Sequence, residues 1–368
     1  MQVRHVQQFI ETWAPRQIAW ERDNIGLLVG SADQDVKRIL VALDITEDVI
    51  DEARRKKIDL LITHHPLIFT PVRSITTRDR VGSLVLRLAR ADIALYAAHT
   101  NLDFAPEGVS FVLARTLGIE KPEILSRGER FYKSIVVFVP VDHLTPVMNA
   151  MSAAGAGAIG KYDSCSFQLE GTGTFRPLEG SNPFIGAQGT LERVKEIRLE
   201  MIVPSWNVPA VVSAMQKAHP YESVAYYLYD LANSSEEYGA GAVGDLKEPV
   251  TLRAFLQIVK RRLNVPSLRH TGNLKQTVRR VAVCGGSGSD LLPAAIENRA
   301  DAFVTADITY HTFQKAEGSI ALIDAGHYET ENLTVRKIVD FLANEFRKRH
   351  VRVAVSASQS SRNPVLYC

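Results

Sequence analysis

Short apolar runs alternate with amphipathic segments through residues 1–127 of the chain. The runs "RILVALDI" (38–45), "IDLLIT" (58–63) and "DIALYAAH" (92–99) have the length and the continuous apolar character of strands that are buried on both faces. The segment "TEDVIDEARRKK" (46–57) carries acidic residues early and basic residues late, which suits a helix. This alternation predicts an α/β fold in which helices cover a mostly parallel sheet.

The same pattern returns in residues 232–368. The runs "RRVAVCGG", "DAFVTADI" and "SIALIDAGH" are predicted strands, and residues 330–349 are predicted to form one long helix. The runs "IDLLIT" and "ADAFVT" resemble each other, which indicates a distant repeat. We therefore expect two similar α/β lobes that face each other, one formed by residues 1–127 and the other by residues 232–368.

Residues 128–231 show a different order of elements. Strand and helix patterns follow one another as βαββαβ, which is the order of a ferredoxin-like split unit. The segment "ANSSEEYGAGAVGD" (232–245) is rich in Ser and Gly and is predicted to be a linker. The interpretation is a small α+β domain inserted between the two lobes.

Composition excludes several classes of protein. Apolar residues make up 46% of the chain and charged residues 23%, with a formal charge of +2, so the basic surface that nucleic-acid binding needs is not expected. No apolar run approaches the ~20 residues of a membrane span. The first residues, "MQVRHVQQFIETWA", carry charge throughout, unlike a signal peptide. Cys165, Cys284 and Cys368 lie far apart, which fits a reducing compartment. A cytoplasmic protein is expected.

Acidic and imidazole side chains end most of the predicted strands. These residues are Asp44, His64, His65, His99, Asp103, Asp307, Asp324 and His327. Because the carboxyl ends of parallel strands meet at one edge of a sheet, where open α/β folds bind ligands, we expect these side chains to gather there.

Two motifs point to metal chemistry at this edge. In "HHP", Pro66 favours an extended His65, so the side chains of His64 and His65 would diverge toward two points. In "GHYETE", His327 and Glu331 are four residues apart and would share one helix face. Solvated turn histidines are the alternative for the first motif, and a carboxylate favoured by the helix dipole is the alternative for the second.

The candidate metal ligands are His64, His65, Asp103, His327 and Glu331. They offer nitrogen and oxygen atoms without sulfur, which suits Zn, Mn, Fe, Co or Ni. Five ligands are many for one catalytic ion and few for two, although a bridging carboxylate would leave two ions with open positions for water. Two carboxylates against two divalent ions would leave excess positive charge, which favours an anionic substrate. Asp103 could instead be a turn former.

His311 and Asp307 are the candidate catalytic residues. Either could transfer a proton, or could support a metal-bound imidazole by accepting its second N–H. A structural role is the alternative for His311, and His99 is a further candidate for such support.

The chain resembles the GTP cyclohydrolase 1 type 2 homologue family of dinuclear-metal proteins over almost its whole length. The motifs that carry the resemblance are "DNIGLLVG" (23–30), "ITHHPLIF" (62–69), "AAHTNLD" (97–103), "TADITYH" (305–311) and "DAGHYETE" (324–331). The resemblance implies two α/β/α lobes around a cleft and a toroidal homohexamer.

The resemblance also implies an assignment of ligands to two divalent ions, with zinc the first choice. His65 and Asp103 would bind one ion, His64 and His327 the other, and Glu331 would bridge both. The middle segment looks like the insert of the longer bacterial members, which is similar to the nitrogen-regulatory PII and divalent-cation-tolerance (CutA) trimers. Its motifs are "AGAGAIGKYDSCSF" (154–167), "GTGTFRP" (171–177) and "HPYESVAYYLY" (219–229).

Two functions follow as expectations. The first is a metal-dependent hydrolase acting on a small anionic, nucleotide-like substrate, with opening of the GTP ring implied by the family name alone. The second is a metal-responsive regulatory or metal-handling binding protein without turnover, which the PII-like insert favours.

Overall fold

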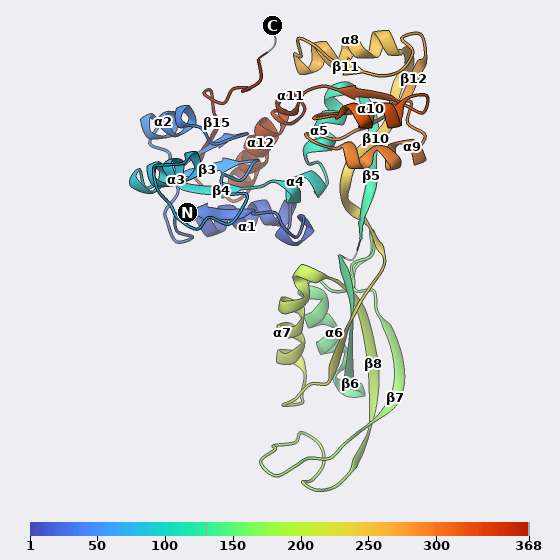
Figure 1. The fold of residues 1–368 in the computed structure, drawn as a ribbon. Helices are drawn as coiled ribbons and strands as arrows, with labels where there is room; N and C mark the ends of the chain where they lie inside the picture. Colours follow the sequence, from blue (N-terminus) through green and yellow to red (C-terminus); the bar gives the residue numbers. More distant parts are fainter. Residues whose placement is uncertain (130, 367–368) are drawn as a thin grey trace. The chain divides into compact units, whose positions relative to one another are not determined.

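The structure is a computed structural model that describes residues 1–129 and 131–366, and it divides into two compact units. The first unit joins Met1–Gly128 to Glu237–Cys368, and the second is Glu129–Glu236. Both units are of the mixed α/β kind (Figure 1). The second unit is therefore an insertion in the sequence of the first.

The first unit contains two sheets, and the first sheet has the strand order β1-β4-β3-β2-β15. Strands β2, β3, β4 and β15 are parallel, and β1 lies antiparallel at the edge beside β4. The strands are β1 (Gly26–Val29), β2 (Arg38–Ala42), β3 (Leu60–Thr63), β4 (Ala94–Ala97) and β15 (Ala354–Ala357). Helices α2 (Glu47–Arg55) and α3 (Arg80–Arg90) pack on the central strands, and α12 (Leu333–Lys348) contacts β2, β15 and α1 (Val3–Trp13).

The second sheet has the order β11-β14-β13-β12-β10-β5, with a parallel centre formed by β12, β13 and β14. Its strands are β5 (Ile119–Glu129), β10 (Ser234–Thr251), β11 (Arg269–His270), β12 (Thr277–Val283), β13 (Ala302–Thr305) and β14 (Ala321–Asp324). Its helices are α5 (Val109–Leu117), α8 (Leu252–Leu263), α9 (Leu292–Glu297) and α10 (Tyr310–Ala316). Phe255 and Phe303 are fully buried in the hydrophobic clusters that join these helices to the sheet.

Each of the two sheets includes a strand from the other part of the sequence. Strand β5, from before the insert, lies in the second sheet, and the C-terminal strand β15 lies in the first. The predicted linker at 232–245 is mostly part of strand β10. Its glycines allow β10 to lie close to β5, because a Cβ on Gly239 would lie 2.3 Å from the Ser126 carbonyl oxygen. Small residues therefore mark strand packing here rather than a flexible connection.

The predicted long helix over 330–349 is also divided. The short helix α11 (His327–Glu331) comes first, and α12 follows it after Asn332. His327 and Glu331 thus open and close one short helix of their own.

The second unit contains the six elements in the predicted order. They are β6 (Tyr132–Pro140), α6 (Leu144–Ala153), β7 (Phe167–Phe175), β8 (Glu192–Pro204), α7 (Val208–Ala218) and β9 (Tyr226–Asp230). The sheet is antiparallel with the order β7-β8-β6-β9. Helices α6 and α7 lie side by side on one face (Figure 1), where Val137, Leu199 and Met215 are fully buried. Within residues 131–236, no helix covers the other face of this sheet.

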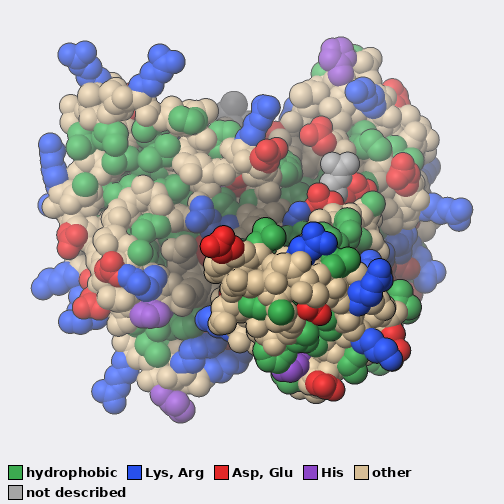
Figure 2. Space-filling view, turned by 90° about the horizontal axis from the view of Figure 1, so that it is seen from below, with side chains coloured by type: hydrophobic (Ala, Val, Ile, Leu, Met, Phe, Trp, Pro, Cys, Tyr) green, Lys and Arg blue, Asp and Glu red, His purple; other side chains and the backbone are tan. Residues whose placement is uncertain are grey.

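The distribution of surface charge and the limited apolar length of the helices agree with the composition. On the face that Figure 2 shows, Lys and Arg side chains are distributed among Asp and Glu side chains. Within residues 1–129 and 131–366, none of the helices combines the length and the apolar character that crossing a membrane requires.

A buried carboxylate fixes the C-terminal segment to the first sheet. Glu52 on α2 accepts hydrogen bonds from the Ser358 hydroxyl (2.7 Å), the Ser360 N–H (3.0 Å) and the Lys56 ammonium (2.6 Å). Burial raises the pKa of Glu52, but the hydrogen bonds from Lys56 and from residues 358–360 outweigh it and lower the pKa to about 2.

We expect Glu52→Gln to lower the free energy of unfolding by about 2 kcal/mol at pH 7, because the amide loses charged hydrogen bonds. Since the folded pKa lies below the ordinary value of 4.5, this stabilisation is fully present above about pH 4.5 and is lost as the pH falls through about 2. Urea unfolding of both proteins at several pH values measures the difference. A difference that stayed constant on acidification would contradict this role for Glu52.

Candidate metal centre

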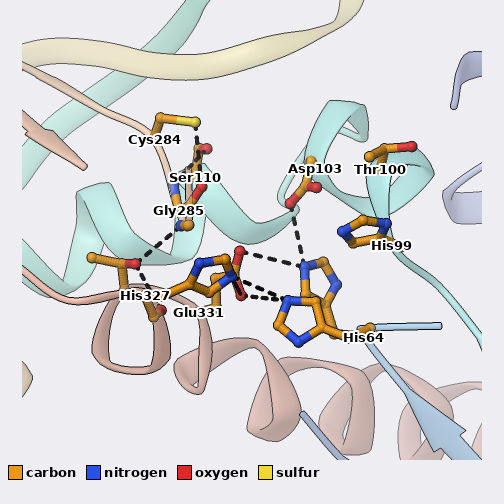
Figure 3. Close-up of polar contacts among 12 residues, drawn as sticks. His64, His99, Thr100, Asp103, Ser110, Cys284, Gly285, His327 and Glu331 are labelled. Atoms are coloured by element: carbon orange, nitrogen blue, oxygen red, sulfur yellow. Dashed lines mark hydrogen bonds and ion pairs between the residues drawn. The ribbon is translucent and has the colours of Figure 1, made fainter. Parts of the chain in front are cut away.

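The ends of strands from both sheets meet at one cluster of imidazole and carboxylate side chains (Figure 3). His64 and His65 follow β3, and His99 follows β4 at the start of the short helix α4 (Thr100–Phe104), which carries Asp103. From the second sheet, α11 supplies His327 and Glu331 immediately after β14. The cluster is therefore placed by the carboxyl ends of parallel strands, as the sequence predicts.

Each imidazole of the cluster has its Nδ1 atom held by an acceptor. The Nδ1 of His64 lies 2.8 Å from the Ala98 carbonyl oxygen, and that of His65 lies 2.8 Å from Asp44 Oδ1. The Nδ1 of His327 lies 2.6 Å from Asp307 Oδ2, and that of His99 lies 3.0 Å from both carboxylate oxygens of Asp23. Because a carbonyl or carboxylate only accepts, the proton sits on Nδ1. Each ring therefore turns Nε2 into the cluster, where it offers a lone pair whenever that nitrogen carries no proton.

Two buried polar atoms converge without a hydrogen-bond partner among the described residues. They are His64 Nε2 and Asp103 Oδ1. His64 Nε2 lies 3.6 Å from Asp103 Oδ1 and 3.8 Å from Glu331 Oε1. Two ligands at the usual ~2.0–2.1 Å from a tetrahedral zinc are about 3.3–3.4 Å apart, so these spacings are close to those of ligands around one ion. Leaving such atoms unpaired in the interior is costly, and a bound cation would satisfy both.

A second and tighter group forms around the other oxygen of Glu331. His65 Nε2 and His327 Nε2 lie 2.9 Å and 3.0 Å from Glu331 Oε2, and 3.2 Å from each other. Lone pairs of two neutral imidazoles and a carboxylate would repel at this range, so either a proton on Nε2 or a bound cation lies between them. Glu331 thus borders both groups, one through each oxygen.

This grouping differs from the one that the resemblance implied. In the structure His64 lies with Asp103, and His65 lies with His327, whereas the resemblance placed His65 with Asp103 and His64 with His327. The cause is the direction of the two neighbouring rings, whose planes are 47° apart. The Ala98 carbonyl aims His64 toward α4, and Asp44 aims His65 toward α11.

His99 also lies in the cluster, although the sequence predicted only a supporting role for it. One nitrogen each of His64, His65 and His99 lies within 4.8 Å of the others, as do the ligand atoms of His65, His327 and Glu331. Either set could hold a metal ion. The motifs "AAHTNLD" and "DNIG" contained His99 and Asp23, but the 76 residues between the two hid their contact.

The pKa values show how strongly the cluster attracts positive charge. Burial lowers the pKa of His65, but Asp44 and Glu331 outweigh it and raise the pKa to about 10. Glu331 raises the pKa of His327 to about 9 against the effect of burial. Burial raises the pKa of Asp103. Burial also raises the pKa of the Cys284 thiol.

A glycine turn after β12 closes the cluster from the second sheet. A Cβ on Gly286 would lie 2.0 Å from Glu331 Oε1 and 3.2 Å from His327 Nε2, so only glycine leaves room for both ligands. The Gly286 N–H donates to Thr330 Oγ1 and the Gly288 N–H to Thr305 Oγ1. With these two N–H groups already engaged, the turn serves the cluster rather than offering a phosphate site.

A cavity of about 430 Å³ opens beside the cluster. Its lining includes His65, His327, Asp44, Asp307, Asp324, Arg269, Tyr328, Glu329, Asn363 and Val365. Arg269 forms an ion pair with Asp324. The carboxylates of Asp44 and Asp307 lie beside His65 and His327 and add two negative charges to those of Asp103 and Glu331. Four carboxylates would balance two divalent ions, in place of the excess positive charge that two carboxylates would leave.

The two candidate catalytic residues lie in different surroundings. Asp307 holds His327 through Nδ1, which is the supporting role considered from sequence. His311 is exposed on α10, where its Nδ1 lies 3.2 Å from Gln314 Oε1. Among the described residues, no hydrogen bond joins His311 to the cluster, and it does not line the cavity.

We expect Asp307→Asn to weaken zinc binding about tenfold, because the uncharged amide holds the His327 ring less firmly and lowers its basicity. Competition with a chromophoric chelator measures the affinity. Asp340→Asn, on the exposed side of α12, is the control and should bind zinc as the unchanged protein does. Equal affinities for all three proteins would contradict the role of Asp307.

Comparison with known proteins identifies the family. Residues 1–364 match the family Duf34/NIF3 (NGG1p interacting factor 3). The chain belongs to this family. A relative from Halalkalibacterium halodurans named "GTP cyclohydrolase 1 type 2 homolog" is 41% identical over 363 residues, covering 98% of this chain and 97% of the relative. A Bacillus subtilis protein of the same name is 39% identical over 362 residues, with the same coverage.

Solved structures show the same fold. A Bacillus cereus protein related to NIF3 superposes with a TM-score of 0.86 at 39% identity, covering 100% of this chain and 99% of that one. A Staphylococcus aureus protein superposes with a TM-score of 0.81 at 30% identity, again over 100% and 99% of the two chains.

Proposed function

We propose that the protein is a dinuclear divalent-metal enzyme that hydrolyses a small, nucleotide-like molecule in the cavity beside the cluster. The observation that carries this proposal is the convergence of His64 Nε2 and Asp103 Oδ1 beside Glu331, both buried and without a hydrogen-bond partner in residues 1–129 and 131–366. Each oxygen of Glu331 faces a different imidazole group, which supports two ions rather than one.

The donor set fits the proposed ions. His64 with Asp103 would hold one ion, His65 with His327 the other, and Glu331 would serve both. Nitrogen and oxygen donors suit Zn first, with Mn, Fe, Co or Ni as alternatives. When bound, such a pair polarises an electrophile and lowers the pKa of water toward ~7.

The protein's own side chains would position the reactants. Asp44 and Asp307 fix the rings of His65 and His327 at the cavity wall. Arg269, paired with Asp324 at the cavity, is the cation that could contact a phosphate or another anionic group. At about 430 Å³ the cavity falls within the range of small-molecule sites. The shared name of the two relatives makes GTP the first substrate to test.

The proposal includes an architecture and an assembly. The two sheets of the first unit would be two α/β/α lobes around the cluster, and the second unit a ferredoxin-like PII/CutA-type domain. The element order and antiparallel sheet of Glu129–Glu236 support that description. The assembly would be a homohexamer built from trimers, and the location the cytoplasm, with neither nucleic acid nor a membrane as partner.

The test combines metal content with turnover. Protein loaded with Zn, Mn, Fe, Co or Ni is incubated with GTP, and formate and phosphate release are measured. We expect release with at least one ion and its loss in His64→Ala, whose metal content should also fall. The absence of both products with every ion would overturn the hydrolase proposal.

The second candidate is a metal-responsive binding protein without turnover. The observation that favours it is a second cavity, remote in sequence from the cluster and formed within the inserted unit. If ligand binding changes with metal content while no product appears, this candidate replaces the hydrolase.

A further inference from the structure

The inserted unit contains a cavity of its own, of about 550 Å³, on the sheet face that its helices leave uncovered. We call it the insert cavity, and its lining includes Phe138, Phe175, Phe184, Glu196, Tyr221 and Tyr227. All of its lining residues belong to Glu129–Glu236. Its size lies within the range of small-molecule sites.

Glycines hollow out the floor of the insert cavity. In the antiparallel register Gly171 lies opposite Glu196, and Leu169 lies opposite Arg198, so these side chains share one face. A Cβ on Gly173 would lie 1.9 Å from Glu196 Oε2, whereas a Cβ on Gly171 would meet nothing within 4 Å. Gly173 therefore lets the Glu196 carboxylate lie over the strand, and Gly171 leaves open space beside it.

The loop over residues 176–191 lines part of the cavity and is held at several points. The Asn182 N–H donates to both oxygens of Glu222, and the Ala187 N–H donates to Glu192. The Phe184 ring lies 6.3 Å from the Tyr221 ring, within the range of aromatic pairs. The loop is thus a fixed wall that brings an aromatic side chain opposite the sheet.

The chemistry of the cavity centres on one buried carboxylate. Glu196 is 8% exposed, and its Oε1 accepts a hydrogen bond from the Tyr221 hydroxyl at 3.0 Å. No described residue donates a hydrogen bond to Glu196 Oε2, and Glu196 forms no ion pair with any described cation. Arg198, the cation in the lining, pairs with Glu200 instead. A buried carboxylate without a cation is costly, so a ligand that brought donors would be favoured.

We propose that the insert cavity binds a planar group presenting two adjacent N–H donors to Glu196, the edge that a guanine-type ring and a guanidinium group share. Parallel N–H groups match the two oxygens of a carboxylate, and charge-assisted bonds of this kind are the stronger ones. Aromatic walls stack on flat groups of either kind. The site does not depend on the metal centre.

The test uses the full-length, zinc-loaded protein and calorimetric titration with four probes. Guanosine and N-acetylarginine amide carry the donor edge, while inosine and N-acetyllysine amide lack it. Binding of guanosine but not inosine would identify a ring as the ligand, and binding of the arginine but not the lysine derivative would identify a guanidinium. If neither donor-bearing probe binds at millimolar concentration, the proposal is overturned.

Variants locate any binding in the cavity. Glu196→Gln should weaken it at least about tenfold, since a hydrogen bond to a charged group is lost. Glu170→Gln, at an exposed carboxylate that also lines the cavity, should change it less than about twofold. Gly171→Leu should abolish binding by filling the open space, with an unchanged melting temperature. Unchanged affinity in Glu196→Gln or Gly171→Leu would overturn the site. Zinc content is expected to be equal in all variants, so a failure of this proposal can be distinguished from a failure of the proposed hydrolase.

Discussion

Replacing Glu331 with glutamine is expected to remove tight binding of divalent metal at both positions of the cluster. The two oxygens of this buried carboxylate border the two imidazole groups, so the amide withdraws a charged ligand from each. Supporting residues alone usually change affinity 10–100-fold, so loss of a shared ligand should cost at least about 100-fold. Metal content after dialysis, measured by mass spectrometry, gives the result.

Glu329→Gln is the matched control for this change. Glu329 lies two residues earlier on the same helix, lines the cavity and accepts a hydrogen bond from the Asn363 amide at 2.9 Å. It faces neither imidazole group, so its variant should retain the metal content of the unchanged protein. Equal metal content in Glu331→Gln and Glu329→Gln would show that Glu331 is not a ligand.

Gly286→Ala has the second largest expected effect, although it changes no ligand. The added Cβ would lie 2.0 Å from Glu331 Oε1, so the carboxylate has to move out of the cluster. We expect affinity for zinc to fall at least about tenfold, on the scale of lost support for a ligand. Zinc titration against a competing chelator measures it.

Backbone strain needs a separate control, because Gly286 has a φ of +60°. Gly160 has nearly the same φ, +57°, and a Cβ there would meet nothing within 4 Å. Gly160→Ala should share the loss of stability, about 1 kcal/mol, without the loss of zinc. If both variants bind zinc alike, the contact with Glu331 is not what makes Gly286 necessary.

The position of the cluster could be predicted from sequence because it follows from topology. Apolar runs identified β3, β4, β13 and β14, and parallel strands end at a common edge, so the residues after them had to lie near one another. His327 and Glu331 are four residues apart, so they share one face of any helix that contains both. These features depend on local pattern and strand direction alone.

The finer arrangement depends on contacts between distant segments, which local pattern does not reveal. The ring of His64 is held by the Ala98 carbonyl, and that of His99 by Asp23, so local pattern reveals neither which side chains lie together nor that His99 lies in the cluster. Strand β10 was read as a linker because its Ser and Gly residues suit both a loop and a strand packed closely against β5. Only the presence of β5 beside this segment distinguishes a strand from a loop.

The number and place of the metal ions is the most direct test of the central claim. Crystals of protein prepared with zinc and without chelator are measured on both sides of the zinc absorption edge. We predict two anomalous peaks about 3.5–4 Å apart, one between His64 and Asp103 and one between His65 and His327, with Glu331 beside both. Peaks absent from this cluster, or found only elsewhere in the chain, would contradict the account.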